Sequence, residues 1–115
     1  MLWGYFKKLI IADRAGVLVN TVFDNYDSYS GSIIALAVFF YCIQLYCDFS
    51  GGIDTARGVA HLFGVNLAEN FRRPIFADSV ADYWRRWHIT LGSWMRDYVF
   101  YPISLSKPFM KLGKF

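Results

Sequence analysis

The residues of this chain that could do chemistry are concentrated in one short segment, residues 83–98. It holds three tryptophans, three arginines and one of the two histidines of the chain. The histidine, His88, has a side chain that exchanges a proton near neutral pH, as a general base requires. Arginines bind phosphate and carboxylate groups. The segment therefore predicts a polar site held in aromatic, largely apolar surroundings, which is typical of functional sites in membrane proteins.

The residues alone leave two interpretations of this segment open. His88 either lines a cavity and takes part in the reaction or is a structural histidine whose ring nitrogens are satisfied by neighbours. Trp84, Trp87 and Trp94 either form a slot for a flat or extended ligand or belong to an interfacial aromatic belt. The arginines either anchor the chain to anionic lipid or bind the phosphates of a cofactor or an acidic carrier protein.

An amphipathic or re-entrant helix is expected to carry the segment over residues 79–101. Ser79 followed by Asp82 resembles a capping box at its start, and Pro102 is expected to end it. At 100° per residue, one apolar stripe would face away from the arginines. The stripe consists of Trp84, His88, Leu91 and Met95.

Two further helices are predicted to lie in a membrane. Residues 28–47 carry no charge, and we expect a transmembrane helix over residues 31–48. Residues 2–23 form a second membrane helix, interrupted by Asp13 and Arg14, which must lie near an interface, pair, or face protein. The glycines at 51 and 52 are expected to break or bend the helix, and a short helix is expected over residues 53–64. The predicted class is an all-α, multi-spanning membrane protein.

Composition and charge agree with this class. The chain of 115 residues is 56% hydrophobic and 20% aromatic, with a net charge of +3. It contains no run of Lys and Arg of the kind that binds nucleic acid. Residues 24–31 are acidic and lack Lys and Arg, whereas basic residues flank both helices on the other side. The positive-inside rule then places residues 24–31 outside and residue 51 onward in the cytoplasm.

Other candidate chemistry is weaker. Asp48 and Ser50 form a polar cluster at the cytoplasmic end of the span, where Asp48 is expected to pair with an arginine. No Gly-x-Ser-x-Gly frame surrounds Ser50, so nucleophilic catalysis is not indicated. Cys42 and Cys47 are interpreted as small apolar residues of the span. No metal-ligand spacing is present, and no metal site is predicted.

Several ordered motifs together resemble the membrane-bound O-acyltransferase family, within it the alginate O-acetyltransferase branch, with the D-alanyl transfer protein of teichoic acid synthesis second. The motifs are Leu2-Trp3-Gly4-Tyr5-Phe6-Lys7-Lys8, Tyr46-Cys47-Asp48-Phe49-Ser50-Gly51, Leu62-Phe63-Gly64, Glu69-Asn70-Phe71-Arg72-Arg73-Pro74, Trp84-Arg85-Arg86-Trp87-His88-Ile89-Thr90-Leu91 and Trp94-Met95-Arg96-Asp97-Tyr98. The resemblance covers nearly the whole chain, residues 1–115.

The resemblance implies a helical funnel through the bacterial plasma membrane. Such proteins move an acyl group, often acetyl, from a cytoplasmic thioester, either acetyl-CoA or an acyl carrier protein, to a hydroxyl. The acceptor would be an extracytoplasmic polysaccharide or polymer, reached with extracytoplasmic partner proteins. No bound cofactor is implied beyond the acyl donor, which is a cosubstrate, and the other partner is membrane lipid.

The resemblance also assigns roles to residues. His88 would be the catalytic histidine of this segment. The funnel and substrate passage would be lined by Trp84, Trp87, Trp94, Asp48 and Ser50. The acyl donor or lipid would be contacted by Arg85, Arg86 and Arg96.

The chain departs from the family pattern in one respect. A second histidine, usually held to be the base, belongs to a Trp-His-Gly sequence on a later helix, and this chain has no such sequence. We therefore expect an internal fragment that is inactive alone. A non-catalytic membrane scaffold, partner subunit or degenerate paralogue is the alternative.

Overall fold

A computed structural model describes residues 1–106 of the chain. They form helices joined by turns and irregular segments, with one isolated β-bridge and no β-strand among them. The predicted all-α class is confirmed for this part of the chain. The chain divides into two units, Met1–Leu67 and Ala68–Phe115, which are described separately.

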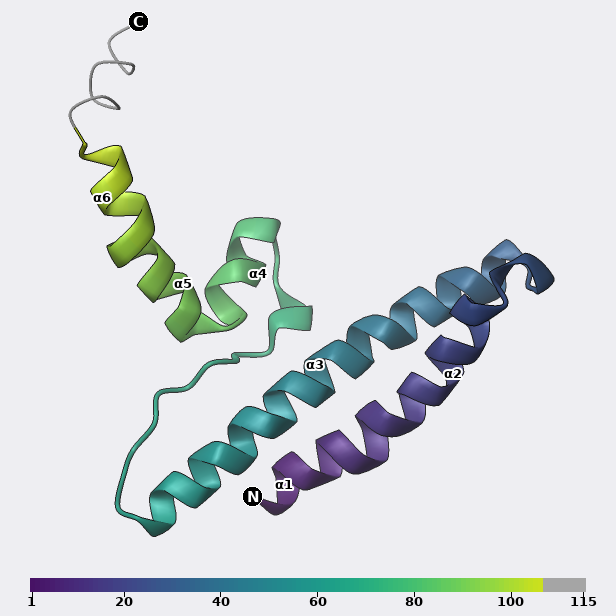
Figure 1. The fold of residues 1–115 in the computed structure, drawn as a ribbon, viewed down its shortest axis with the longest axis horizontal. Coiled ribbons are helices and arrows are strands. Elements are labelled where there is room, and N and C mark those ends of the chain that lie inside the picture. Colours follow the sequence, from purple (N-terminus) through teal and green to yellow (C-terminus); the bar gives the residue numbers. More distant parts are fainter. Residues whose placement is uncertain (107–115) are drawn as a thin grey trace, which may run out of the picture. The chain divides into compact units, whose positions relative to one another are not determined.

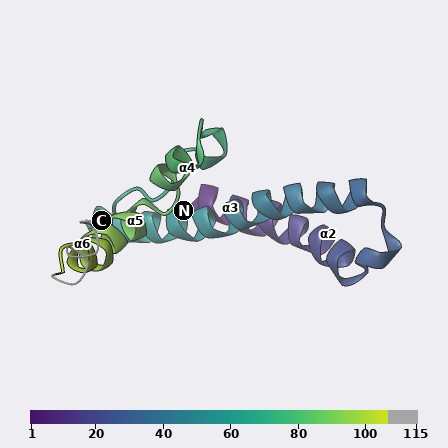
Figure 2. The same ribbon diagram turned by 90° about the horizontal axis from the view of Figure 1, so that it is seen from above.

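The first unit is a long helical hairpin. Its first arm runs without a break from α1 (Leu2–Tyr5) through a π-helical segment, η1 (Phe6–Ala12), to α2 (Asp13–Asp24). A short 3₁₀ turn, η2 (Tyr26–Ser28), leads into the second arm, α3 (Gly31–Leu62). Figures 1 and 2 show α2 and α3 side by side from two directions. Residues 2–24 are thus helical, as predicted for 2–23, although the π-helical segment was not foreseen.

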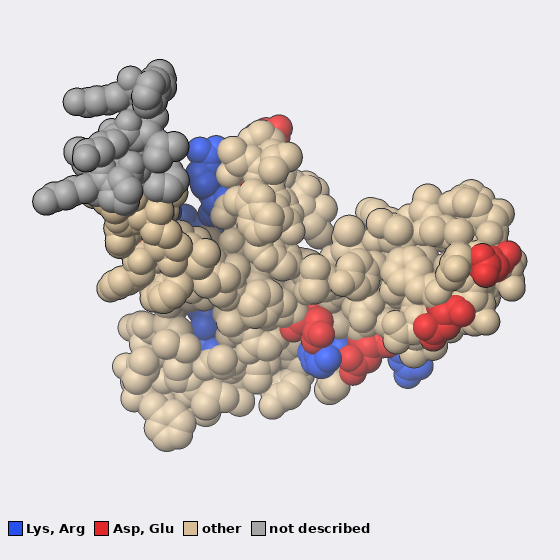
Figure 3. Space-filling model, turned by 45° about the horizontal axis from the view of Figure 1, so that its top comes forward, with Lys and Arg blue, Asp and Glu red and all other residues tan. Residues whose placement is uncertain are grey.

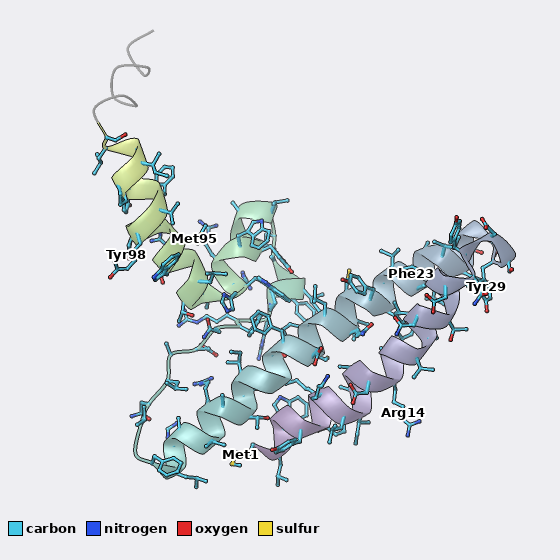
Figure 4. The ribbon with its side chains drawn as sticks, in the orientation of Figure 1. Met1, Arg14, Phe23, Tyr29, Met95 and Tyr98 are labelled. Carbon is cyan, nitrogen blue, oxygen red and sulfur yellow. The ribbon has the colours of Figure 1, made fainter. Side chains whose placement is uncertain are left out.

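Helix α3 is the one helix within residues 1–106 that is long and apolar enough to cross a membrane. Its apolar side chains are mostly exposed on the hairpin, as in Leu36, Val38 and Phe39. An apolar surface of this kind suits lipid or further helices better than water. The helix of the first arm is continuous, but its apolar sequence is interrupted by Asp13 and Arg14. Asp13 pairs with a lysine described below, and the side chain of Arg14 points away from α3 (Figure 4).

The glycine pair does not break the helix, and the prediction of a separate helix over residues 53–64 is wrong. Helix α3 continues through Gly51 and Gly52 to Leu62, so no separate helix begins at residue 53. Gly51 is buried against the first arm, and a Cβ atom there would lie 2.8 Å from the carbonyl oxygen of Gly4. The missing side chain therefore lets two backbones approach, which is a frequent use of glycine between membrane helices.

The second unit contains short helices rather than one long one. A 3₁₀ turn, η3 (Pro74–Phe76), precedes α4 (Val80–Arg86) and α5 (Ile89–Met95). The chain then runs through a π-helical segment, η4 (Arg96–Phe100), into α6 (Tyr101–Ser104). The prediction of one helix over residues 79–101 is wrong, because the helix is interrupted between α4 and α5.

Both ends of the predicted helix can be compared with the structure. The cap at its start is confirmed: the hydroxyl of Ser79 accepts a hydrogen bond of 3.1 Å from the backbone N–H of Asp82. Pro102 does not end the helix but lies inside α6. A π turn precedes it, in which the N–H of Tyr101 bonds to the carbonyl of Arg96. Such a turn re-pairs backbone groups that a proline would otherwise leave free.

Candidate functional site

His88 lies at the interruption between α4 and α5. Its backbone has φ 44° and ψ 55°, in the left-handed region that residues other than glycine seldom adopt. The residue before it, Trp87, is extended. The predicted stripe is therefore wrong, because Trp84 and His88 do not lie on one helix. A sharp turn, rather than a helix face, positions the histidine.

The turn is held by backbone pairing with the segment that precedes η3. Phe71 and Trp87 form an antiparallel β-bridge. On one side of it the N–H of Arg72 donates to the carbonyl of Arg86, and on the other the N–H of Ile89 donates to the carbonyl of Asn70, both at 3.0 Å. The residues on either side of His88 are thus tied to one extended segment.

The side chain of Asn70 adds two more bonds to the same turn. Its Oδ1 atom accepts from the backbone N–H of Thr90 at 3.1 Å and from the Thr90 hydroxyl at 2.6 Å. Asn70 is 9% exposed. Asn70 is not among the site residues predicted from the sequence. Asparagine is a preferred helix cap, but this one lies 20 positions from the helix it caps, so no local pattern indicates the contact.

Aromatic rings surround the turn. The ring of Trp87 packs edge-on against Phe71, with centroids 4.9 Å apart, and stacks on Tyr83 at 5.6 Å and 14°. The His88 ring lies 6.4 Å from the Phe71 ring and is half-buried. The structure therefore brings together two predicted site residues, Trp87 and His88, and adds Phe71 and Tyr83.

The other two tryptophans are on different elements and are more open. Trp84 in α4 is 61% exposed and packs edge-on against Tyr83. Trp94 in α5 is 52% exposed and stacks on Tyr98. Their predicted role as walls of a passage stays a prediction.

The arginines divide into two groups. Arg85 and Arg86 both pair with Asp82, at 3.7 Å and 2.7 Å. The hydrogen bond from Arg86 lowers the pKa of the Asp82 carboxyl below its ordinary value. Their charges are thus partly balanced by a carboxylate of the same helix.

Arg96 lies instead at the start of η4, at the edge of an open apolar cavity of about 370 Å³. The cavity is lined by Met95, Arg96, Val99, Phe100, Ile103 and Ser104. Contact of any of the three arginines with donor or lipid stays a prediction.

Asp48 and Ser50 belong to a different cluster, in the hairpin. The ammonium of Lys7, a residue only 6% exposed, donates to the Ser50 hydroxyl at 2.9 Å and pairs with Asp54 at 2.7 Å. Lys8 pairs with Asp48 at 2.7 Å, so the expected arginine partner of Asp48 is wrong.

Lys8 also reaches Asp13, at 3.2 Å, so it balances one carboxylate from each arm. On the face shown in Figure 3, acidic and basic groups lie next to one another, and most of the surface belongs to residues other than Lys, Arg, Asp and Glu.

Lys7 and Asp54 are likewise not among the site residues predicted from the sequence. One pattern in the sequence indicates these two residues. Ser50 and Asp54 are four residues apart, so they share one helix face beside Gly51, where a lysine could contact both. Because both Asp48 and Ser50 are bonded to lysines of the first arm, they lock the two arms of the hairpin together. A role in lining a substrate passage stays a prediction for both.

The described residues show no metal centre: within residues 1–106, no group of three or more His, Cys, Asp or Glu side chains could hold an ion.

Comparison with known proteins identifies the family. The sequence model described as MBOAT, membrane-bound O-acyltransferase family, matches residues 18–115. A Pseudomonas putida protein named "Probable alginate O-acetylase" is 39% identical over 97 residues, which are 84% of this chain and 20% of that protein. A Helicobacter pylori "Peptidoglycan O-acetyltransferase" is 39% identical over 101 residues, covering 88% of this chain and 19% of that protein.

A third relative, a Bacillus subtilis "Teichoic acid D-alanyltransferase", is 34% identical over 103 residues, covering 84% of this chain and 25% of that protein. The chain thus spans about a fifth to a quarter of the length of these curated relatives. No solved structure matches it significantly.

The matches confirm the resemblance that the motifs of the sequence predict. The matched residues, 18–115, include α3, the Asn70 segment and the His88 turn, and residues 1–17 lie outside the match. The chain therefore belongs to the membrane-bound O-acyltransferase family.

Proposed function

We propose that this chain forms part of a membrane O-acyltransferase that modifies a polymer of the bacterial cell envelope. The observation that carries the proposal is the placement of His88, in a left-handed turn beside Trp87 and Phe71, within a chain of this family. A backbone outlier at a titratable residue is a reason to expect function there.

A polymer acceptor is supported by the names of the relatives. They act on alginate, peptidoglycan and teichoic acid, and two of the three are named for O-acetyl transfer. We propose acetyl as the acyl group, carried to the site as a cytoplasmic thioester of coenzyme A or a carrier protein.

In the proposed reaction, the acceptor hydroxyl oxygen forms a bond to the thioester carbonyl carbon and the carbon–sulfur bond breaks. A base takes the hydroxyl proton, which then passes to the departing thiolate. His88 orients or polarises the donor, and a second histidine outside this chain acts as the base. The rings of Trp87 and Phe71 would exclude water beside His88, which strengthens its polar contacts.

The proposed topology places the loop between the two arms outside the cell. This loop holds Asp24 and Asp27 and has no basic residue, whereas Lys7 and Lys8 lie toward the other end of the hairpin. A single cysteine in place of Ser28 should react with a membrane-impermeant maleimide added to intact cells. A cysteine in place of Gly52 should react only after the membrane is opened, and the reverse pattern would contradict the topology.

The test of the function replaces His88 in the complete gene product that carries this sequence. Transfer of labelled acetyl from acetyl-CoA to cell-envelope polymer should fall by about 10²–10³-fold in His88→Ala, the usual effect of losing one hydrogen-bond donor to a reacting carbonyl. The control is His61→Ala, because His61 is an exposed histidine at the end of α3. Membrane yield should be unchanged in both variants.

Near-normal transfer in His88→Ala would leave His88 a packing residue. If the unsubstituted protein transfers no acyl group from either thioester, the enzyme proposal fails and a non-catalytic scaffold takes its place.

A further inference from the structure

We propose that Asn70 is the positioning residue of this site: its side chain and carbonyl hold the turn that places His88. The proposal rests on the proposed function, because it matters to the reaction only if His88 takes part in it. None of the hydrogen bonds described above joins Asn70 to the ring of Trp87 or Phe71, the two aromatic residues beside His88.

Helix α5 begins without a cap of its own. The residue at its N-cap position is His88, whose side chain makes no capping hydrogen bond and whose backbone is left-handed. The first N–H groups of a helix have no partner within the helix and must find one elsewhere. Asn70 supplies that partner from another segment.

Asn70 accepts three hydrogen bonds from this turn. The carbonyl of Asn70 accepts from Ile89 N–H, and its Oδ1 accepts both the N–H and the hydroxyl of Thr90. All three donors belong to the two residues that follow His88. Because the N–H of Ile89 is part of the peptide that begins at His88, fixing it fixes the ψ angle of the histidine.

The other side of His88 is fixed by the same segment. The bridge between Phe71 and Trp87, and the bond from Arg72 N–H to the Arg86 carbonyl, hold the residues just before it. Substitutions other than proline leave those backbone bonds in place, whereas the bonds of the Asn70 side chain can be removed. Asn70 is therefore the position at which a substitution can release the turn.

The side-chain oxygen of Asn70, not its nitrogen, holds the turn. Both side-chain bonds use Oδ1 as an acceptor, and no bond described here uses the amide nitrogen. A carboxylate oxygen can accept the same two bonds and is favoured near a helix N-terminus. Asn70→Asp should therefore keep the turn, while Asn70→Ala and Asn70→Leu should not.

The experiment measures steady-state acyl transfer by the complete gene product in its membrane. Asn70→Ala should lower kcat by roughly 10–100-fold with little change in KM, since a small misplacement of a reacting group can cost about 10²-fold. Asn70→Asp should restore kcat to within about threefold of the unsubstituted protein. Thr90→Val, which keeps its N–H but loses the hydroxyl, should have a smaller effect than Asn70→Ala.

A second readout does not depend on activity. In a background without other cysteines, the maleimide reactivity of a His88→Cys variant reports whether the turn is intact. Adding Asn70→Ala should raise the labelling rate, and adding Asn70→Asp should leave it unchanged. A control substitution at Asn25, whose side chain caps the end of α2 in the other unit, should leave it unchanged as well.

The outcomes separate the two proposals. If the unsubstituted protein lacks transferase activity, the proposed function fails, and the labelling arm alone decides whether Asn70 holds the turn. If the protein is active but Asn70→Ala matches it in kcat and in labelling, the positioning role is wrong. Equal losses in Asn70→Ala and Asn70→Asp would also overturn it, because the argument requires only an acceptor oxygen.

Discussion

Replacing Gly51 with alanine should loosen the hairpin, whereas the same change at its neighbour Gly52 should not. A Cβ atom at Gly51 would lie 2.8 Å from the carbonyl oxygen of Gly4 and 3.2 Å from the backbone nitrogen of Lys8. Ordinary contact begins at 3.4 Å, so the arms must separate by several tenths of an ångström. A Cβ atom at Gly52 would meet nothing within 4 Å.

The magnitude follows from two opposing effects. Alanine in place of a helical glycine gains about 1 kcal/mol of helix propensity, and both variants share this gain. Only Gly51→Ala also suffers overpacking, which costs about 1–3 kcal/mol. The difference between the two variants therefore isolates the contact between the arms. The same separation would stretch the ion pair of the buried Lys7, whose Cβ atom lies 3.4 Å from the added atom.

Thiol labelling of Cys47 measures this difference. Cys47 lies in α3 and is 7% exposed, whereas Cys42 is exposed and is first replaced by serine. Labelling of Cys47 in membranes then requires the arms to open. At about tenfold per 1.4 kcal/mol, Gly51→Ala should label roughly 5–150-fold faster than Gly52→Ala. Equal rates in the two variants would refute the reasoning, because they differ only in the contact with the first arm.

Three further changes follow from other contacts. Asp54→Asn should destabilise the hairpin by about 3 kcal/mol because it leaves the buried charge of Lys7 without its carboxylate. Replacing both residues, Lys7→Met together with Asp54→Leu, should restore the protection of Cys47 from thiol labelling. Ser79→Ala should cost about 1 kcal/mol of helix stability by removing the cap of α4, measured as faster amide exchange there. Because Arg86 lowers the pKa of Asp82, the carboxylate stabilises this helix above its unfolded pKa near 3.8, and this stability is lost as pH falls through the lower folded value. The protection factors of the α4 amides, which are corrected for the pH dependence of intrinsic exchange, should therefore fall at acid pH in the unsubstituted protein, and this fall should be absent in Asp82→Asn.

The hairpin was largely predictable from the sequence, because hydrophobic length and turn composition determine its two arms. The uncharged run before Asp48 predicts a helix, and the acidic loop predicts the turn between the arms. The continuation past Gly51 was not predictable from local pattern. A glycine pair on its own predicts a helix break. Here Gly51 packs against the backbone of Gly4 in the first arm, and this contact joins residues far apart in the sequence.

The site was predictable in its residues but not in its shape. The segment around His88 has helical periodicity throughout, so a single helix was the natural expectation. The residues that interrupt it act from a distance: Asn70 bonds to Thr90 across 20 positions, and Phe71 pairs with Trp87. Long-range pairing of this kind overrides local propensity and leaves no pattern in the helix itself.

The interruption at His88 is better explained by function than by stability. A left-handed residue other than glycine costs roughly 1–2 kcal/mol, and a continuous helix would have avoided that cost while keeping its own hydrogen bonds. Most of the bonds from Asn70 and Arg72 replace bonds that the same backbone groups would make in a continuous helix. Only the bond from the Thr90 hydroxyl is additional, and at about 0.5–1.5 kcal/mol it roughly offsets the cost of the left-handed residue. The left-handed turn fixes the direction of the His88 imidazole beside the rings of Phe71 and Trp87. Replacing His88 with glycine should therefore preserve or raise the stability of the turn while lowering acyl transfer as much as His88→Ala does, and a loss of stability together with activity would contradict this explanation.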